Sequence, residues 1–62
     1  MDATEFGAIR KRLKLTQPKL GLALGGYKER AIRHWESGSH KIPLAVAVLM
    51  QRMASDWQRT RT

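Results

Sequence analysis

Apolar residues near the start of the chain recur at the spacing of an α-helix. Phe6, Ile9 and Leu13 lie three and four positions apart, so a helix places all three on one face. The opposite face is basic, as expected where a helix meets solvent. The pattern therefore predicts a helix over about residues 3–13.

A second apolar pattern, interrupted by glycines, covers the middle of the chain. Leu20 and Leu24 are four positions apart and share a helix face, which predicts a short helix over about residues 17–24. Gly25 and Gly26 then end this helix, because glycine readily adopts conformations with which helices stop.

After this break the helical spacing resumes. Ala31, Ile32 and Trp35 form the inward face of a helix predicted over about residues 28–37. Its outward positions are Glu29, Arg30, Arg33 and His34. Two short helices joined by a glycine-containing turn, the second basic on its outer face, are typical of a helix-turn-helix DNA-binding motif.

An almost continuous apolar run, residues 44–50, follows Pro43. A helix that is apolar nearly all round is enclosed by its neighbours, so we expect this one to be largely buried. Apolar residues continue at helical spacing, so the helix either runs to about Trp57 or breaks near Ser55 into a further turn. Residues 58–62 are expected to fray.

Residues suited to helix N-caps precede these segments. Asp2 or Thr4 can cap the first helix and Thr16 the second, because their side-chain oxygens accept hydrogen bonds from free amides of the first turn. Lys28, before the third helix, is a poor capping residue. The elements together predict one all-α domain over residues 1–62, a compact bundle of four to five short helices.

The charge balance narrows the class of partner. The chain carries 12 Lys and Arg against 5 Asp and Glu, a formal net charge of +7, which favours a polyanion. No apolar run reaches the roughly 18 residues of a spanning helix, and the cations do not lie opposite one continuous apolar face, so we expect no membrane partner. The N-terminus lacks the pattern of a signal peptide, which favours a cytoplasmic protein.

The sequence offers little for catalysis. It has no cysteine, no pair of carboxylates on one face and no phosphate-binding loop preceded by a strand, so we expect neither an enzyme nor a cofactor. His34 and His40 are six positions apart with no third ligand nearby, and we expect no metal site. No small-molecule ligand is expected either.

An ordered set of residues runs through most of the chain. It consists of Leu15, Thr16, Gln17, Leu20, Gly21, Leu24, Gly25, Ile32, Trp35, Glu36, Gly38, Ile42 and Pro43. This set resembles the signature of the phage repressor/Cro (XRE-type) helix-turn-helix family. The resemblance implies a lambda repressor-like DNA-binding domain that acts as a sequence-specific transcriptional regulator. The chain has one residue more than the family pattern between Gly25 and Ile32, so Tyr27 falls in a lengthened turn and the base-contact register after it stays open.

The outward face of the third helix supplies candidates for base readout, because arginine can bond guanine bidentately and the other polar side chains can reach base edges. These candidates are Lys28, Glu29, Arg30, Arg33 and His34. The resemblance implies phosphate contacts at the start of the second helix and in the loop after the third. These candidates are Gln17, Ser37, Ser39, His40 and Lys41.

The resemblance also implies structural roles for several residues. Glu36 matches the acidic residue that pairs with an arginine of the first helix, here Arg10. Gly21 is expected where the two helices of the motif cross, at a position that accepts a β-carbon but not a long side chain. Trp35 is expected in the core.

A single unit of this size contacts few base pairs, so we expect a homodimer on a palindromic site in double-stranded DNA. The candidates for the dimer contact are Met50, Met53 and Trp57. Such a repressor would act in the cytoplasm of a prokaryotic host cell, associated with the nucleoid through DNA. The alternative is an antitoxin-like or other protein-interaction module that uses the same fold to bind an acidic protein partner.

Overall fold

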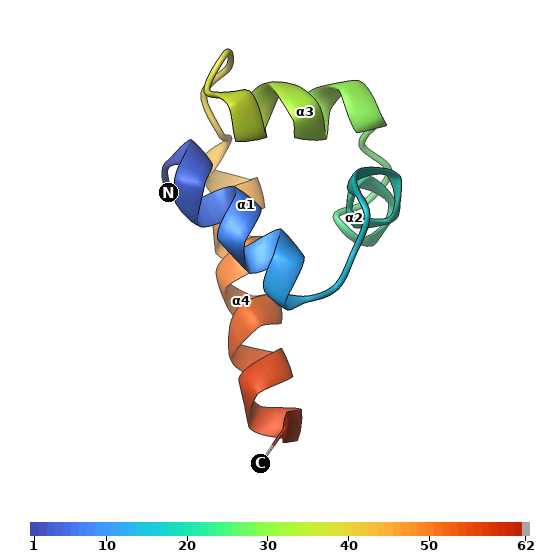
Figure 1. The fold of residues 1–62 in the computed structure, drawn as a ribbon, viewed down its shortest axis with the longest axis vertical. Helices are drawn as coiled ribbons and strands as arrows, with labels where there is room; N and C mark the ends of the chain where they lie inside the picture. Colours follow the sequence, from blue (N-terminus) through green and yellow to red (C-terminus); the bar gives the residue numbers. More distant parts are fainter. Residues whose placement is uncertain (62) are drawn as a thin grey trace.

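Four α-helices follow one another without a strand in the described part of the chain (Figure 1). The computed structural model describes the backbone of residues 1–61 and the side chains of residues 1–58. The helices are α1 (Ala3–Arg12), α2 (Gln17–Ala23), α3 (Glu29–Ser37) and α4 (Leu44–Arg61). The predicted all-α fold is confirmed, and the observed ends of the first three helices differ from the expected ones by one residue at most.

The helix starts follow the capping chemistry of the sequence. Asp2, and not Thr4, caps α1: its Oδ1 accepts a hydrogen bond from the amide of Glu5 at 2.7 Å. Thr16 caps α2 by accepting from the amide of Lys19 at 3.4 Å. Lys28 occupies the cap position of α3 and makes no side-chain capping bond, as its residue type predicts.

The connection between α2 and α3 packs directly against Gly21. The carbonyl of Gly21 accepts the amides of both Gly26 and Tyr27, at 3.0 and 2.9 Å. A β-carbon on Gly21 would lie 2.0 Å from the carbonyl oxygen of Tyr27, far inside van der Waals contact. The expectation that this position accepts a β-carbon is therefore wrong, because the neighbour is backbone of the turn itself and not a side chain of α3.

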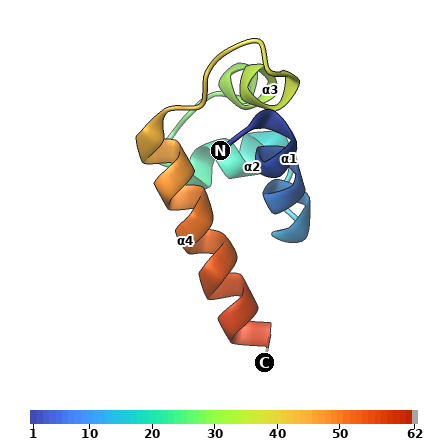
Figure 2. The ribbon, with the colours of Figure 1, turned by 90° about the vertical axis from the view of Figure 1, so that its left-hand side faces the viewer.

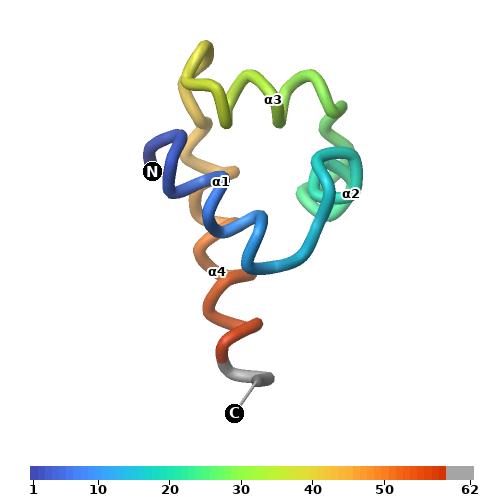
Figure 3. Tube along the Cα trace, viewed as in Figure 1, coloured from blue at the N-terminus to red at the C-terminus, as the bar shows by residue number. Residues whose placement is uncertain are grey.

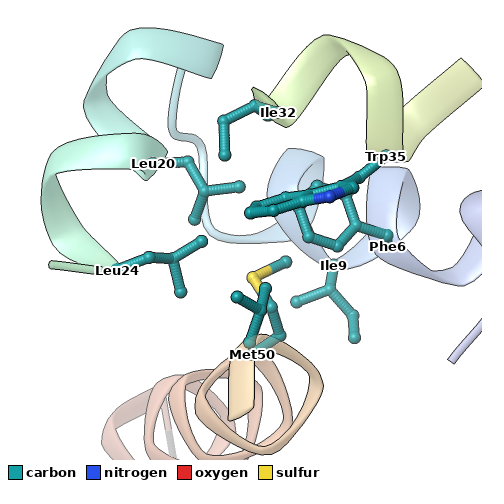
Figure 4. Close-up of a cluster of buried hydrophobic side chains, with 8 residues drawn as sticks. Phe6, Ile9, Leu20, Leu24, Ile32, Trp35 and Met50 are labelled. Atoms are coloured by element: carbon teal, nitrogen blue, oxygen red, sulfur yellow. The ribbon is translucent and has the colours of Figure 1, made fainter. Parts of the chain in front are cut away.

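One apolar core joins all four helices (Figure 4). Its members are Phe6 and Ile9 of α1, Leu20 of α2, Leu24 at its end, Ile32 and Trp35 of α3, and Val46 and Met50 of α4. The Trp35 ring meets the Phe6 ring edge-on, with ring centroids 5.9 Å apart. It meets the Tyr27 ring in the same way at 5.1 Å. The expected core position of Trp35 is confirmed.

α4 is buried on one face only. Val46, Ala47 and Met50 point into the core, whereas Leu44 is 80% exposed and Leu49 40% exposed. The expectation of a largely enclosed helix is wrong, because only α1–α3 are available to cover α4 and they all lie on one side of it (Figure 2).

α4 also extends beyond the other helices. It continues without a break to Arg61, past both the expected end at Trp57 and the expected break near Ser55. It gives the molecule its long dimension of 35 Å, against 19 and 18 Å across (Figure 3). The tail expected to fray, residues 58–62, is helical to Arg61 at the level of the backbone, and Thr62 lies outside the described residues.

Candidate nucleic-acid interface

The outer face of α3 is polar and accessible. α3 lies along the end of the molecule opposite to the end of α4, in both side views (Figures 1 and 2). Ile32 and Trp35 are buried on its inner side. Among the candidates for base readout, Lys28, Glu29, Arg30 and Arg33 are exposed and His34 is half-buried. The structure thus brings all five onto one short helix and its cap residue.

Two residues of this face pair with one another. Arg33 donates from Nη2 to Glu29 Oε2 at 3.2 Å, one helical turn away. Both side chains are open to solvent, 65% and 46% exposed, so the pair contributes well under about 1 kcal/mol to stability. Its consequence is electrostatic: Glu29 offsets the positive charge of Arg33 on this face.

The loop after α3 folds back against the end of that helix. The Ser37 hydroxyl donates to the carbonyl of His34 at 3.1 Å and lies 2.9 Å from the Ser39 hydroxyl. His40 brings its ring against that of His34, with centroids 4.5 Å apart. With Lys41, these loop residues form an exposed polar edge continuous with α3.

Gln17, the remaining phosphate candidate, is half-buried and turned toward the core side of the motif. Its Nε2 donates to Glu36 Oε2 at 3.3 Å. The side chain therefore links the first turn of α2 to α3, and any phosphate contact made by its amide has to share the group with Glu36.

Arg10 and Glu36 form the expected ion pair between α1 and α3. Arg10 Nε donates to Glu36 Oε1, and Nη2 donates to Oε2 at 3.4 Å. Nη1 donates to the carbonyl of Leu15 at 2.9 Å, so the same guanidinium also holds the α1–α2 connection. The two side chains are 16% and 17% exposed. Together with Gln17, this pair fixes the relative placement of three helices.

The expected dimer contacts are corrected in part. Met50 is fully buried in the core, so it cannot contact a second chain. Met53 and Trp57 are half-buried, and Met53 packs against the core. The large apolar side chains exposed on the described part of α4 are instead Leu44, Val48 and Leu49. The sequence concealed them because, in an uninterrupted apolar run, no polar residue marks the outward face.

Two further exposed residues, Lys19 and Tyr27, lie beside this surface, and the sequence analysis did not select them as contact candidates. Lys19 is exposed in the first turn of α2, which adds a cation to the motif. Tyr27 is 39% exposed at the start of α3 while its ring contacts Trp35. The feature of the sequence that could have indicated both residues is their position close to the start of a predicted helix.

The described residues contain no cluster of three or more metal-ligating side chains. Within that same part of the chain, no helix combines the length and the apolar character needed to cross a bilayer. Comparisons of the chain with protein-family models, with curated proteins and with solved structures found no match. The function proposed below therefore rests on the residues and their arrangement.

Proposed function

We propose that this chain is a sequence-specific double-stranded DNA-binding transcriptional regulator of the repressor/Cro type, with α3 as its recognition helix. The observation that carries the proposal is the outer face of α3. Two exposed cations, Arg30 and Arg33, lie on a helix whose other face is packed into the core through Ile32 and Trp35. A third exposed cation, Lys28, lies at its cap position. The major groove is about 12 Å wide, which accommodates one helix of 10–12 Å diameter.

The surrounding charges support the same partner. The net charge of +7 draws the chain toward a polyanion, and Lys41 extends the cationic surface beyond α3. The helix-turn-helix interpretation is supported by the short α2, the tight turn on Gly21 and the crosswise α3 that follows it (Figure 1). A protein of this function would act at the nucleoid of a prokaryotic cell.

The decisive experiment is a selection of bound sites from a random double-stranded DNA library, followed by titration of the selected site at several salt concentrations. We expect one motif to be enriched, and affinity to fall steeply with salt because phosphate neutralisation releases counterions. Enrichment of no site over bulk DNA would overturn the sequence-specific proposal.

A matched pair of substitutions locates the interface. Arg33→Ala should weaken binding to the selected site by about 1–3 kcal/mol if Arg33 bonds a base. Arg12→Ala removes the same charge from an exposed residue at the end of α1, outside α2 and α3, and should change affinity much less. Equal losses in the two variants would mean that binding is charge-driven and not located on α3.

We further propose that the regulator binds as a homodimer on two half-sites about one helical turn apart. The exposed apolar residues Val48 and Leu49 of α4 support this surface, in place of the buried Met50. Sedimentation equilibrium should show a dimer for the natural chain and a monomer for Leu49→Asp. Leu22→Asp, at a 75% exposed leucine of α2, is the control and should leave the dimer intact. A natural chain that stays monomeric on and off DNA would contradict the dimer.

The alternative, an antitoxin-like module that binds an acidic protein, shares the basic face but predicts another outcome. Arg33→Ala and Gln17→Ala would then abolish a protein complex while leaving binding to the selected DNA unchanged. No contact among the described residues favours that alternative over DNA.

A further inference from the structure

The two histidines of the chain lie together although they are six positions apart in the sequence. His34 is in the last turn of α3 and His40 is in the loop that follows. Their ring centroids are 4.5 Å apart and the ring planes are tilted by 59°. No other histidine and no cysteine occurs in the chain. The fold thus places the two imidazole side chains of the protein in contact with one another.

Backbone geometry, and not the rings themselves, sets this approach. Gly38 ends α3 with a φ of 82°, a left-handed conformation that favours glycine and turns the chain back on the helix. The amides of Ser39 and His40 both donate to the carbonyl of His34, at 3.0 and 3.4 Å. Because these bonds involve main-chain groups, they hold the loop against the end of α3 independently of the contact between the rings.

The ring nitrogens have no competing partner in the described structure. Neither imidazole makes a hydrogen bond to another residue whose side chain is described, and the nearby Ser37 and Ser39 hydroxyls bond one another instead. A neutral imidazole has one nitrogen with a free lone pair, and with no fixed partner either tautomer is accessible. His40 is exposed and His34 half-buried, so both rings are open to an ion from solvent.

We propose that His34 and His40 chelate one divalent transition-metal ion, with Cu²⁺ as the preferred ion. Imidazole suits copper, nickel and zinc, and affinity for divalent ions of the first row is greatest at Cu²⁺. Metal–nitrogen bonds of about 2 Å need one nitrogen of each ring on a common point, which the contact between the rings permits after small side-chain rotations. Water fills the remaining positions.

The surroundings define the kind of site. Closed structural zinc sites use four protein ligands, whereas this pair supplies two and stays open to solvent. Lys41, next to His40, and the net charge of +7 oppose any cation. Both effects weaken binding and favour the ion with the strongest intrinsic affinity for nitrogen. The site therefore binds an exchangeable ion and does not hold a resident cofactor.

The test is a titration of the full chain with Cu²⁺ alone, without DNA, in a buffer that does not coordinate metals. Pulsed electron paramagnetic resonance of the complex counts the coordinated imidazoles. We expect two imidazoles on one ion in the natural chain at one ion per chain. A spectrum with one imidazole, or with none, would overturn the proposal without the need for any variant.

Substitutions give an independent check. His40→Asn lies in an exposed loop and should leave the fold unchanged by circular dichroism, while its complex shows a single imidazole and binds at least roughly 10-fold more weakly. His34→Asn should do the same. The double variant measures the background from the amino terminus and carboxylates, and equal affinity of this variant and the natural chain would contradict the site. Since no DNA is present, failure of the proposed DNA binding leaves this result unaffected.

Discussion

A β-carbon on Gly21 would lie 2.0 Å from the carbonyl oxygen of Tyr27, so a side chain at this position would force the turn between α2 and α3 to move. The same Gly21 accepts two amides of that turn through its own carbonyl. The placement of α3 relative to α2 therefore depends on the absence of a side chain at one residue.

Gly21→Ala should destabilise the protein by about 2–3 kcal/mol, because the turn has to move away from the added methyl group. Gly7→Ala is the matched control in α1, where the β-carbon would meet nothing nearer than 3.9 Å. There the helix propensity of alanine should stabilise the protein by up to about 1 kcal/mol. Thermal unfolding measures both effects, because in a domain of this size each kcal/mol shifts the Tm by about 4–8 °C. Shifts of the same sign in the two variants would contradict the close approach.

Two ion pairs among the described residues, Arg10–Glu36 and Arg33–Glu29, should differ in their contribution to stability. Glu36→Gln leaves Arg10 without its acid in a setting where both side chains are less than one-fifth exposed, so we expect a loss of about 1–3 kcal/mol. Glu29→Gln removes the partner of Arg33 on an open helix face and should cost under about 0.5 kcal/mol. Urea unfolding of both variants at low and high salt measures the two costs, and the cost at the exposed pair should depend more on salt. A cost for Glu36→Gln no larger than that for Glu29→Gln would show that Arg10 and Glu36 do not hold α1 against α3.

Truncation of two adjacent residues of α4, Leu49 and Met50, should destabilise the protein by different amounts. Met50→Ala opens a cavity in the core and should cost about 2–5 kcal/mol. Leu49→Ala removes a side chain that is already 40% exposed, so the isolated chain should lose less than about 1.5 kcal/mol. Denaturant unfolding at low protein concentration, where self-association does not contribute, gives both values. The opposite order would mean that α4 is rotated about its axis.

Glu29→Gln should raise affinity for DNA even though it hardly changes stability. The substitution removes one negative charge from the outer face of α3 and frees Arg33 from its ion pair. Fluorescence anisotropy with duplex DNA at low salt should show tighter binding to selected and to unrelated sites. Glu5→Gln is the control, since it removes the same charge from the first turn of α1. An unchanged or weaker affinity of Glu29→Gln would indicate that Glu29 itself contacts the DNA.

Much of the fold could be predicted because it depends on local chemistry. The apolar spacing of Phe6 and Ile9, the capping oxygens of Asp2 and Thr16, and the glycine at residue 38 act within one or two turns of the chain. These interactions decide where helices begin, end and face the core, and the predicted bounds follow the observed ones closely for α1–α3.

Other properties depend on the directions in which the helices cross. These directions could not be predicted from the spacing of residue types along the chain. The burial of Arg10 with Glu36 and the contact of Gln17 with Glu36 arise only once three helices meet. Met50 is inside and Leu49 outside because the other helices cover a single side of α4.

The sequence by itself thus determined the bounds of the first three helices to within a residue, the cap of α2, the basic character of α3 and the candidates on its outer face, because each follows from spacing and residue type. Only the tertiary structure decided that Gly21 touches the Tyr27 backbone and that His34 meets His40. Both contacts depend on the path of the chain after the end of a helix. That path is set by the backbone angles of a few turn residues, and these determine where the next segment lies.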